Sequence, residues 1–261
     1  MDLKEKIIHS HIDHYSNISN GYNSLYHVGN DSYQQWILSI IIKELNINSN
    51  SLITDVGGGT GSFSKKIFDI ANLKSPVLCV DSSDAMLKIA NDYNGVITEC
   101  LDAQQFAKQS RIKQQKFDGI LLKEMIHHIP RNEIQKLYSD LGDCLTKNGI
   151  ILTVTRPNEV VYPLFRRAHK VWREQQPSKD ELLNYIEQAG LSVVCKSVFI
   201  DIRLPKEQWF HMIRSRFWST FSHFNDEELE DGIDELKIMF ANEINVSFTE
   251  ELLLFIAKIE I

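Results

Sequence analysis

The amino-acid sequence predicts an α/β fold: a doubly wound, mostly parallel seven-stranded sheet with helices on both faces and a helical insertion between the last two strands. Short apolar runs that suit buried strands alternate along the chain with segments of helical apolar spacing. A glycine-rich turn, VGGGTGSF, follows the first of these runs. Hydrophobic content of 43% and charged content of 24% are ordinary values for a globular protein.

The first half of the chain predicts a helix followed by strands that alternate with helices. Apolar spacing predicts the first helix over 33–45, and the polar turn NINSNS ends it. The expected strands are then SLITDV, PVLCVD, GVITECLD and KFDGILLK, and the expected helices cover 62–71, 83–93 and 131–145.

The second half predicts three more strands. The turn signal NG precedes a fifth strand, IILTVTRP, and a capping box formed by Ser178 and Glu181 begins a helix that ends at Gly190. LSVVCKSVFI and ELLLFIAKIEI are the last two strands. Between them, two helices rich in aromatic residues, arginine and histidine are expected over about 203–242. This insertion is either a lid over a substrate or ordinary packing on the sheet edge.

Composition excludes several classes of protein. The 261 residues include 35 acids and 28 bases, so the net charge is −7, which disfavours nucleic acid as a partner. The four cysteines are far apart and form no metal-binding pair, as expected of core thiols in a reducing compartment. The N-terminal MDLKEKIIHSHIDHYS is too charged for a signal peptide, and no apolar run reaches the ~18 residues of a membrane span. We therefore expect a cytoplasmic protein without membrane contact.

The glycine-rich turn favours a cationic ligand over a dinucleotide. Gly57, Gly59 and Gly61 give the pattern G-x-G-x-G, and Ser62 stands where the dinucleotide fingerprint requires a third glycine. Asp55, two residues before the first glycine of this pattern, would repel a diphosphate. Bare backbone at this turn lets main-chain N–H groups approach a ligand closely.

Five segments in order make the chain resemble the class I S-adenosylmethionine-dependent methyltransferases over about residues 14–200. They are ITDVGGGTGSF, VLCVDSSDAML, CLDAQQF, FDGILLKEMIHHIP and LTKNGIILTV. The resemblance implies S-adenosylmethionine as cofactor, S-adenosylhomocysteine as product and a single methyltransferase domain over 1–261. Its expected parts are an N-terminal helical cap (1–45), a cofactor-binding half (51–157) and a substrate half with the insertion (158–261).

The resemblance assigns cofactor contacts to residues at the ends of the first three strands. Asp55 would face the ammonium of the methionine moiety beside the glycine turn, although a carboxylate there can instead cap the loop. Asp81, with Ser82 beside it, would hold both ribose hydroxyls, or would cap the next helix. Met86 would lie against adenine or belong to the core. Asp102 and Ala103 would read the amino edge of adenine, with a generic loop aspartate as the alternative.

Two further cofactor contacts follow from the resemblance. YSNISNGYN resembles the family's entry segment, in which Tyr22 would cover the methionine end of the cofactor, or simply pack. Lys123 departs from the small residue that commonly follows the fourth strand. It would still hold the cofactor through its backbone carbonyl.

The segment KEMIHHIP decides much about the acceptor. It lacks the Asn/Asp-Pro-Pro-aromatic motif of enzymes that methylate amide or base nitrogens, so DNA adenine and protein glutamine are not expected acceptors. His127 would point into the active site as general base, and His128 is its neighbour. Structural histidines are the alternative, and no metal is expected.

Acceptor contacts are expected from the segment after the fifth strand and from the insertion. Arg156, Tyr162, Trp209, Arg216 and Trp218 suggest a small acceptor with an aromatic or anionic part, although packing explains most of them equally well. The expected function is methyl transfer to a small molecule by a monomer or homodimer. A non-catalytic domain that binds S-adenosylmethionine or S-adenosylhomocysteine is the alternative, and a nicotinamide oxidoreductase is a distant third.

Overall fold

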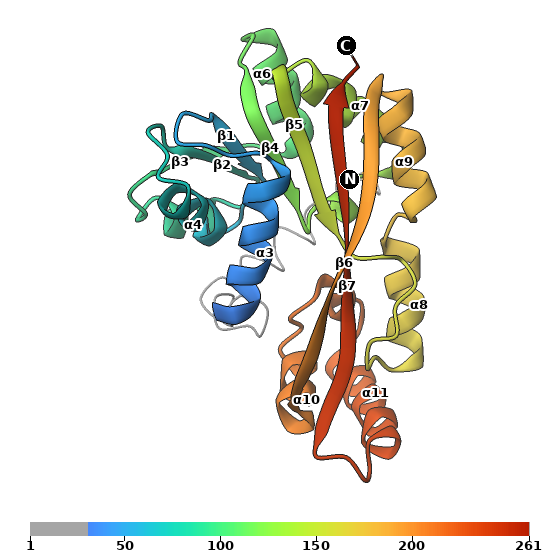
Figure 1. Ribbon diagram of the computed structural model, residues 1–261. Coiled ribbons are helices and arrows are strands. Elements are labelled where there is room, and N and C mark those ends of the chain that lie inside the picture. Colours follow the sequence, from blue (N-terminus) through green and yellow to red (C-terminus); the bar gives the residue numbers. More distant parts are fainter. Residues whose placement is uncertain (1–30, 261) are drawn as a thin grey trace.

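A computed structural model describes residues 31–260 and contains one seven-stranded sheet (Figure 1). The strand order is β3-β2-β1-β4-β5-β7-β6. The strands are β1 (Ile53–Val56), β2 (Val77–Asp81), β3 (Val96–Cys100), β4 (Phe117–Lys123), β5 (Leu145–Thr155), β6 (Leu191–Pro205) and β7 (Asn245–Ile259).

The sheet is mixed: most of its strand pairs are parallel, as expected, but its last strands are antiparallel and so depart from a parallel, doubly wound sheet. β1 to β5 are parallel to their neighbours, whereas β7 is antiparallel to both β5 and β6. The chain enters β7 from the insertion rather than from a crossover helix, so the strand can return in the opposite direction.

Helices cover both faces of the sheet. Those that precede the insertion are α3 (Asp31–Glu44), α4 (Ser62–Ile70), α5 (Asp84–Ala90), α6 (Ala103–Ile112), α7 (Arg131–Gly142), α8 (Arg166–Gln175) and α9 (Lys179–Gln188), with the short 3-10 helix η1 (Ile126–His128) after β4. Ile41 and Ile67 of α3 and α4 share one core with Leu152, while Leu137 and Ile186 of α7 and α9 belong to the other. Alternate residues of a strand point to opposite faces, so β5 contributes to both cores.

The insertion forms a lobe on extensions of the last two strands. All fifteen residues of β6 pair with β7, but only Leu253–Ala257 of β7 also pair with β5. Figure 1 shows the remaining halves of β6 and β7 running away from the sheet between two helices. The lobe contains α10 (Lys206–Arg214), the 3-10 helix η2 (Ser219–His223) and α11 (Asp226–Met239). We call these elements, with residues 198–205 and 245–252, the insertion lobe.

Several element boundaries differ from those expected. β5 begins at Leu145 rather than at residue 150, β6 continues to Pro205, and α8 was not foreseen as a helix. Ile202 and Leu204 are buried while Arg203 between them is exposed, so the strand alternation of β6 persists to the start of the insertion.

Candidate active site

A cavity of about 170 Å³ opens at the carboxyl ends of β1, β2 and β4. The strand order reverses between β1 and β4, and ligands of open α/β sheets bind at such a switch point. Most of the residues expected to bind a cofactor line it: Asp55, Gly57, Gly59, Asp81, Ser82, Met86, Asp102, Ala103 and Lys123. We call this the first cavity.

The glycine turn shapes one wall of the first cavity. Gly57 and Gly59 have φ of 75° and 56°, a region that favours glycine. A Cβ on Gly57 would lie 2.8 Å from the side chain of Met125, whereas a Cβ on Gly59 would meet nothing within 4 Å. Gly59 therefore leaves open the space that a ligand needs. Gly61 does not line the cavity; its Cβ would lie 2.7 Å from that of Ala90, so it serves the packing of α4.

Asp55 is a buried carboxylate at the end of β1. It is 2% exposed, and Ser64 Oγ donates a 2.7 Å hydrogen bond to its Oδ2. Burial raises the pKa of Asp55 to about 6, opposed by the Ser64 hydrogen bond and by the charge of Lys123. A cation bound in the cavity would favour the ionised form.

Asp81, at the end of β2, accepts hydrogen bonds from the glycine turn and from the loop that follows it. Gly59 N–H donates to Oδ2 at 2.9 Å and Ser83 N–H donates to Oδ1 at 2.8 Å, so the carboxylate fixes the glycine turn and the loop before α5. Burial raises its pKa. Ser83, not Ser82, is the N-cap of α5, and Ser82 lines the cavity. A carboxylate has about four lone-pair sites, so two bonds leave capacity for ribose hydroxyls.

Residues at the starts of α5 and α6 form another wall of the first cavity. Met86 is 2% exposed and lines the cavity while it also packs in the core. Asp102 is the N-cap of α6 and accepts a 2.6 Å hydrogen bond from Gln105 N–H, and Ala103 follows it. Gln104 and Ile129, which the sequence did not single out, also line the cavity.

Lys123 ends β4 and borders the first cavity with a half-buried side chain. Its Nζ lies 4.3 Å from the ring centre of Phe63. Burial and the charge of Arg156 lower the pKa of Lys123 to about 8. Its ammonium forms no ion pair with any carboxylate in the described part of the chain.

A second cavity of about 40 Å³ adjoins the first and shares Lys123 and Glu124 with it. Its other walls come from η1, β5, α8 and the insertion lobe: His127, Arg156, Trp172, Gln176, Phe217, Trp218, Ser219 and Thr220. His128 lines the first cavity instead, although its ring centre is only 4.0 Å from that of His127. Each histidine thus faces a different cavity. Tyr22 lies outside the described residues.

Glu124 is a further residue at this site that sequence reasoning missed. It has φ of 55°, uncommon for a non-glycine residue, and its N–H donates to the carbonyl of Val154. Its carboxylate pairs with Arg156, which also donates to Glu250 at 2.6 Å and lies 5.3 Å from the Trp218 ring. Glu124 Oε1 is buried, and no residue within 31–260 hydrogen-bonds to it. Nothing in the sequence around Glu124 predicts a positive φ at this residue.

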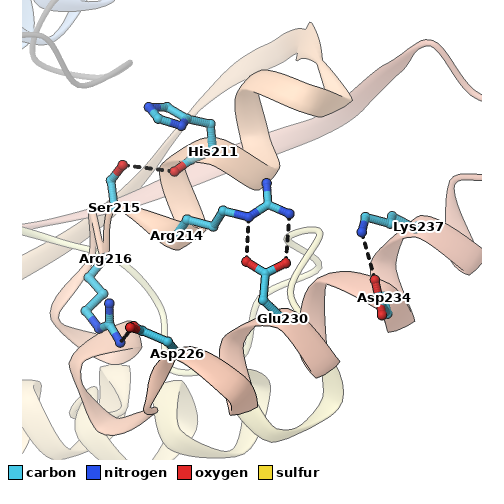
Figure 2. A network of polar contacts seen from close by, with 8 residues as sticks. All are labelled: His211, Arg214, Ser215, Arg216, Asp226, Glu230, Asp234 and Lys237. Atoms are coloured by element: carbon cyan, nitrogen blue, oxygen red, sulfur yellow. Dashed lines mark hydrogen bonds and ion pairs between the residues drawn. The ribbon is translucent and has the colours of Figure 1, made fainter.

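The insertion lobe presents aromatic rings to the second cavity and arginines to solvent. Trp218 packs against Trp172 and Phe217 with ring centres 5.0 and 4.4 Å apart. Figure 2 shows Arg214 and Arg216 bound instead to Glu230 and Asp226 of α11. Both pairs lie at the surface and tie α10 and the turn after it to α11. These two arginines therefore do not reach the second cavity.

Comparison with known proteins supports this geometry. Residues 53–149, which run from β1 into β5 and include the glycine turn, Asp81, Asp102 and Lys123, match the family model described as a methyltransferase domain. The chain carries a methyltransferase domain. Its resemblance to the class I enzymes is thereby confirmed, with S-adenosylmethionine as the cofactor of this class. The open space at Gly59 and the carboxylate of Asp81 fit that cofactor.

Solved structures share the fold of the methyltransferase domain across most of their length. YcgJ from Bacillus subtilis covers 85% of this chain and 98% of its own, with 16% identity and a TM-score of 0.60. The cyclopropane synthase MmaA2 from Mycobacterium tuberculosis covers 87% and 84%, with 12% identity and a TM-score of 0.58. Magnesium protoporphyrin IX methyltransferase from Synechocystis PCC 6803, solved with bound S-adenosylmethionine, covers 91% and 83%, with 14% identity and a TM-score of 0.52. No curated relative matches by sequence.

A cyclopropane synthase and a magnesium protoporphyrin IX methyltransferase are named for different products. The shared fold therefore leaves the acceptor of this chain open.

Among residues 31–260, none of the helices has the length and apolar character of a membrane span. The same residues contain no cluster of His, Cys, Asp and Glu suited to a metal ion.

Proposed function

We propose that this chain transfers a methyl group from S-adenosylmethionine to a small-molecule acceptor whose nucleophile enters the second cavity. The observation that carries the proposal is that Lys123 and Glu124 line both cavities, so the two cavities adjoin. A cofactor in the first cavity and a nucleophile in the second would meet beside these two residues. Holding both reactants in line is the main task of such an enzyme.

The cofactor supplies a methyl carbon already activated by the sulfonium, and the chain supplies position and a proton acceptor. Asp55 and Asp81 would hold the methionine and ribose parts, and Asp102 the adenine. Glu124 and His127 border the second cavity, where either can accept the proton of an O–H or N–H nucleophile. Trp172, Phe217 and Trp218 would pack against the acceptor and exclude water.

The rings and the cation Arg156 favour an acceptor with an aromatic or anionic part. The cavity of about 40 Å³ holds only the reacting group of such a molecule. A larger acceptor would therefore need side chains that line this cavity to rearrange. This small volume also favours the alternative, a domain that binds the cofactor or its product without transferring the methyl group.

Formation of S-adenosylhomocysteine during incubation with S-adenosylmethionine and a panel of phenols, amines and carboxylates, followed by mass spectrometry, tests the proposal. We expect at least one acceptor class to give turnover that His127→Ala or Glu124→Gln reduces by at least about tenfold. A matched control is His211→Ala, since His211 lies on α10 near the exposed Arg214–Glu230 pair (Figure 2). Tight cofactor binding without turnover for any acceptor would favour the non-catalytic alternative.

A further inference from the structure

The sheet register places an acid and a base side by side at the first cavity. Asp55 of β1 is paired with Leu121 of the parallel neighbour β4. Side chains in register on adjacent strands point to the same face, and so does the residue two positions further on. Asp55 and Lys123 therefore project from the same face at the carboxyl ends of the two strands where the order reverses. Both line the first cavity.

Lys123 has no anionic partner among the described residues. Its ammonium lies near the Phe63 ring and within Coulombic range of Asp55, but it forms no hydrogen bond or ion pair with any described residue. Withdrawing an ammonium from water without such a partner costs free energy. The depressed pKa of about 8 reflects that cost. An anion delivered to the cavity would relieve it.

We infer that the Lys123 side chain binds the α-carboxylate of the cofactor's methionine moiety, while Asp55 faces its α-ammonium. This inference rests on the proposed function and adds a side-chain role to a residue for which the sequence predicted only a backbone contact. The two charges of an amino-acid zwitterion sit on one carbon, and Asp55 and Lys123 offer the complementary charges on adjacent strands. Lys123 then recognises the amino-acid end of the ligand.

The other buried cation nearby is already neutralised. Arg156 is held by both Glu124 and Glu250, and its pKa is raised by the nearby Glu250 carboxylate. It lines only the second cavity. Lys123 is thus the cation at the first cavity that a carboxylate can reach without breaking an existing ion pair.

A cycle of two proteins and two ligands tests the inference without an acceptor. Isothermal titration would compare wild type and Lys123→Met with S-adenosylhomocysteine and with 5′-deoxy-5′-(3-aminopropylthio)adenosine, which lacks only the carboxylate. Loss of a charge-assisted hydrogen bond should weaken S-adenosylhomocysteine binding about 10- to 100-fold in Lys123→Met. The decarboxylated ligand should bind both proteins with affinities that agree to within about threefold. Any difference should favour Lys123→Met, because this variant removes the repulsion between the Lys123 ammonium and the ammonium of the ligand. Lys116→Met, just before the opposite end of β4, is the matched control.

The outcomes separate this inference from the proposed function. If the ligand without a carboxylate loses as much affinity for Lys123→Met as for wild type, another group holds the carboxylate. That result would overturn the inference. Equal affinity of wild type for the two ligands would overturn it as well, even if Lys123→Met fails to fold. Failure of both adenosyl ligands to bind wild type would instead contradict the proposed function.

Discussion

Asp55 is held in its charged form at a cost to the ligand-free protein. Its folded pKa of about 6 exceeds its usual value of 3.8, chiefly because of burial. Below about pH 4 the carboxyl is protonated in both the folded and unfolded states, and its ionisation then has no effect on stability. As pH rises toward about 6, the unfolded chain loses its proton first, and stability falls by about 3 kcal/mol in total.

We therefore predict that Asp55→Asn stabilises the ligand-free protein at pH 7. The amide can still accept the Ser64 hydrogen bond, and the desolvated charge is gone. Thermal melts should show a gain of several degrees at pH 7 that vanishes near pH 4. Binding of S-adenosylhomocysteine should weaken at the same time. A variant that melts below wild type at pH 7 would contradict this account of Asp55.

Asp81→Ala should weaken both the cofactor site and the loops around it. Loss of two ribose hydrogen bonds to a charged acceptor should reduce S-adenosylhomocysteine affinity by about 1.5–3 kcal/mol in titration calorimetry. Stability should fall too, because Gly59 and Ser83 lose their acceptor. Asp84→Ala, which removes an exposed pair with Lys88, is the control. Unchanged affinity in the folded variant would make Asp81 a loop cap alone.

The sequence predicted those site residues that lie directly at the end of a strand. Asp55, Asp81 and Asp102 reach the first cavity because parallel strands end at one edge of the sheet. Gly61 could not be separated from Gly59, since the difference lies in the contact with Ala90, distant in sequence. Glu124 was missed because its left-handed backbone is set by tertiary structure and not by its residue type.

The insertion lobe acts as a packing element through Trp218. This side chain is 9% exposed and lies among Tyr162, Trp172 and Phe217. We predict that Trp218→Ala costs about 3–5 kcal/mol of unfolding free energy, measured by denaturant titration. Arg216→Ala should cost less, about 1–2 kcal/mol, because it removes a surface ion pair with Asp226 and a hydrogen bond to the Phe224 carbonyl. A Trp218→Ala variant as stable as wild type would support a mobile lid instead.

At the scale of elements, the apolar runs located every strand of the sheet but not every boundary. ELLLFIAKIEI is nearly continuous in apolar residues because that half of β7 is buried between two neighbours. Residues 245–252 pair only with β6, and the buried Glu250 interrupts their apolar alternation, so this half of the strand was hidden from sequence. The helix α8 opens with two arginines and carries few apolar residues, which left its helical period unclear.

For the whole molecule, the arrangement of the sheet explains where function lies. The reversal of strand order opens the first cavity, and the lobe on β6 and β7 closes the second. The sequence predicted the α/β class and the strand–helix alternation, while the antiparallel β7 depends on how the chain returns from the lobe. The second cavity joins residues from β4, β5, α8 and the lobe, a juxtaposition that no local pattern encodes.

The lining of the first cavity suits an adenosyl amino acid and not a dinucleotide. Titration calorimetry of the purified full chain with S-adenosylhomocysteine and with NADH, at one pH and salt concentration, tests it most directly. We predict saturable binding of S-adenosylhomocysteine and no detectable heat of binding with NADH, because Asp55 would repel a diphosphate at the glycine turn. Saturable binding of NADH with none of S-adenosylhomocysteine would contradict the account.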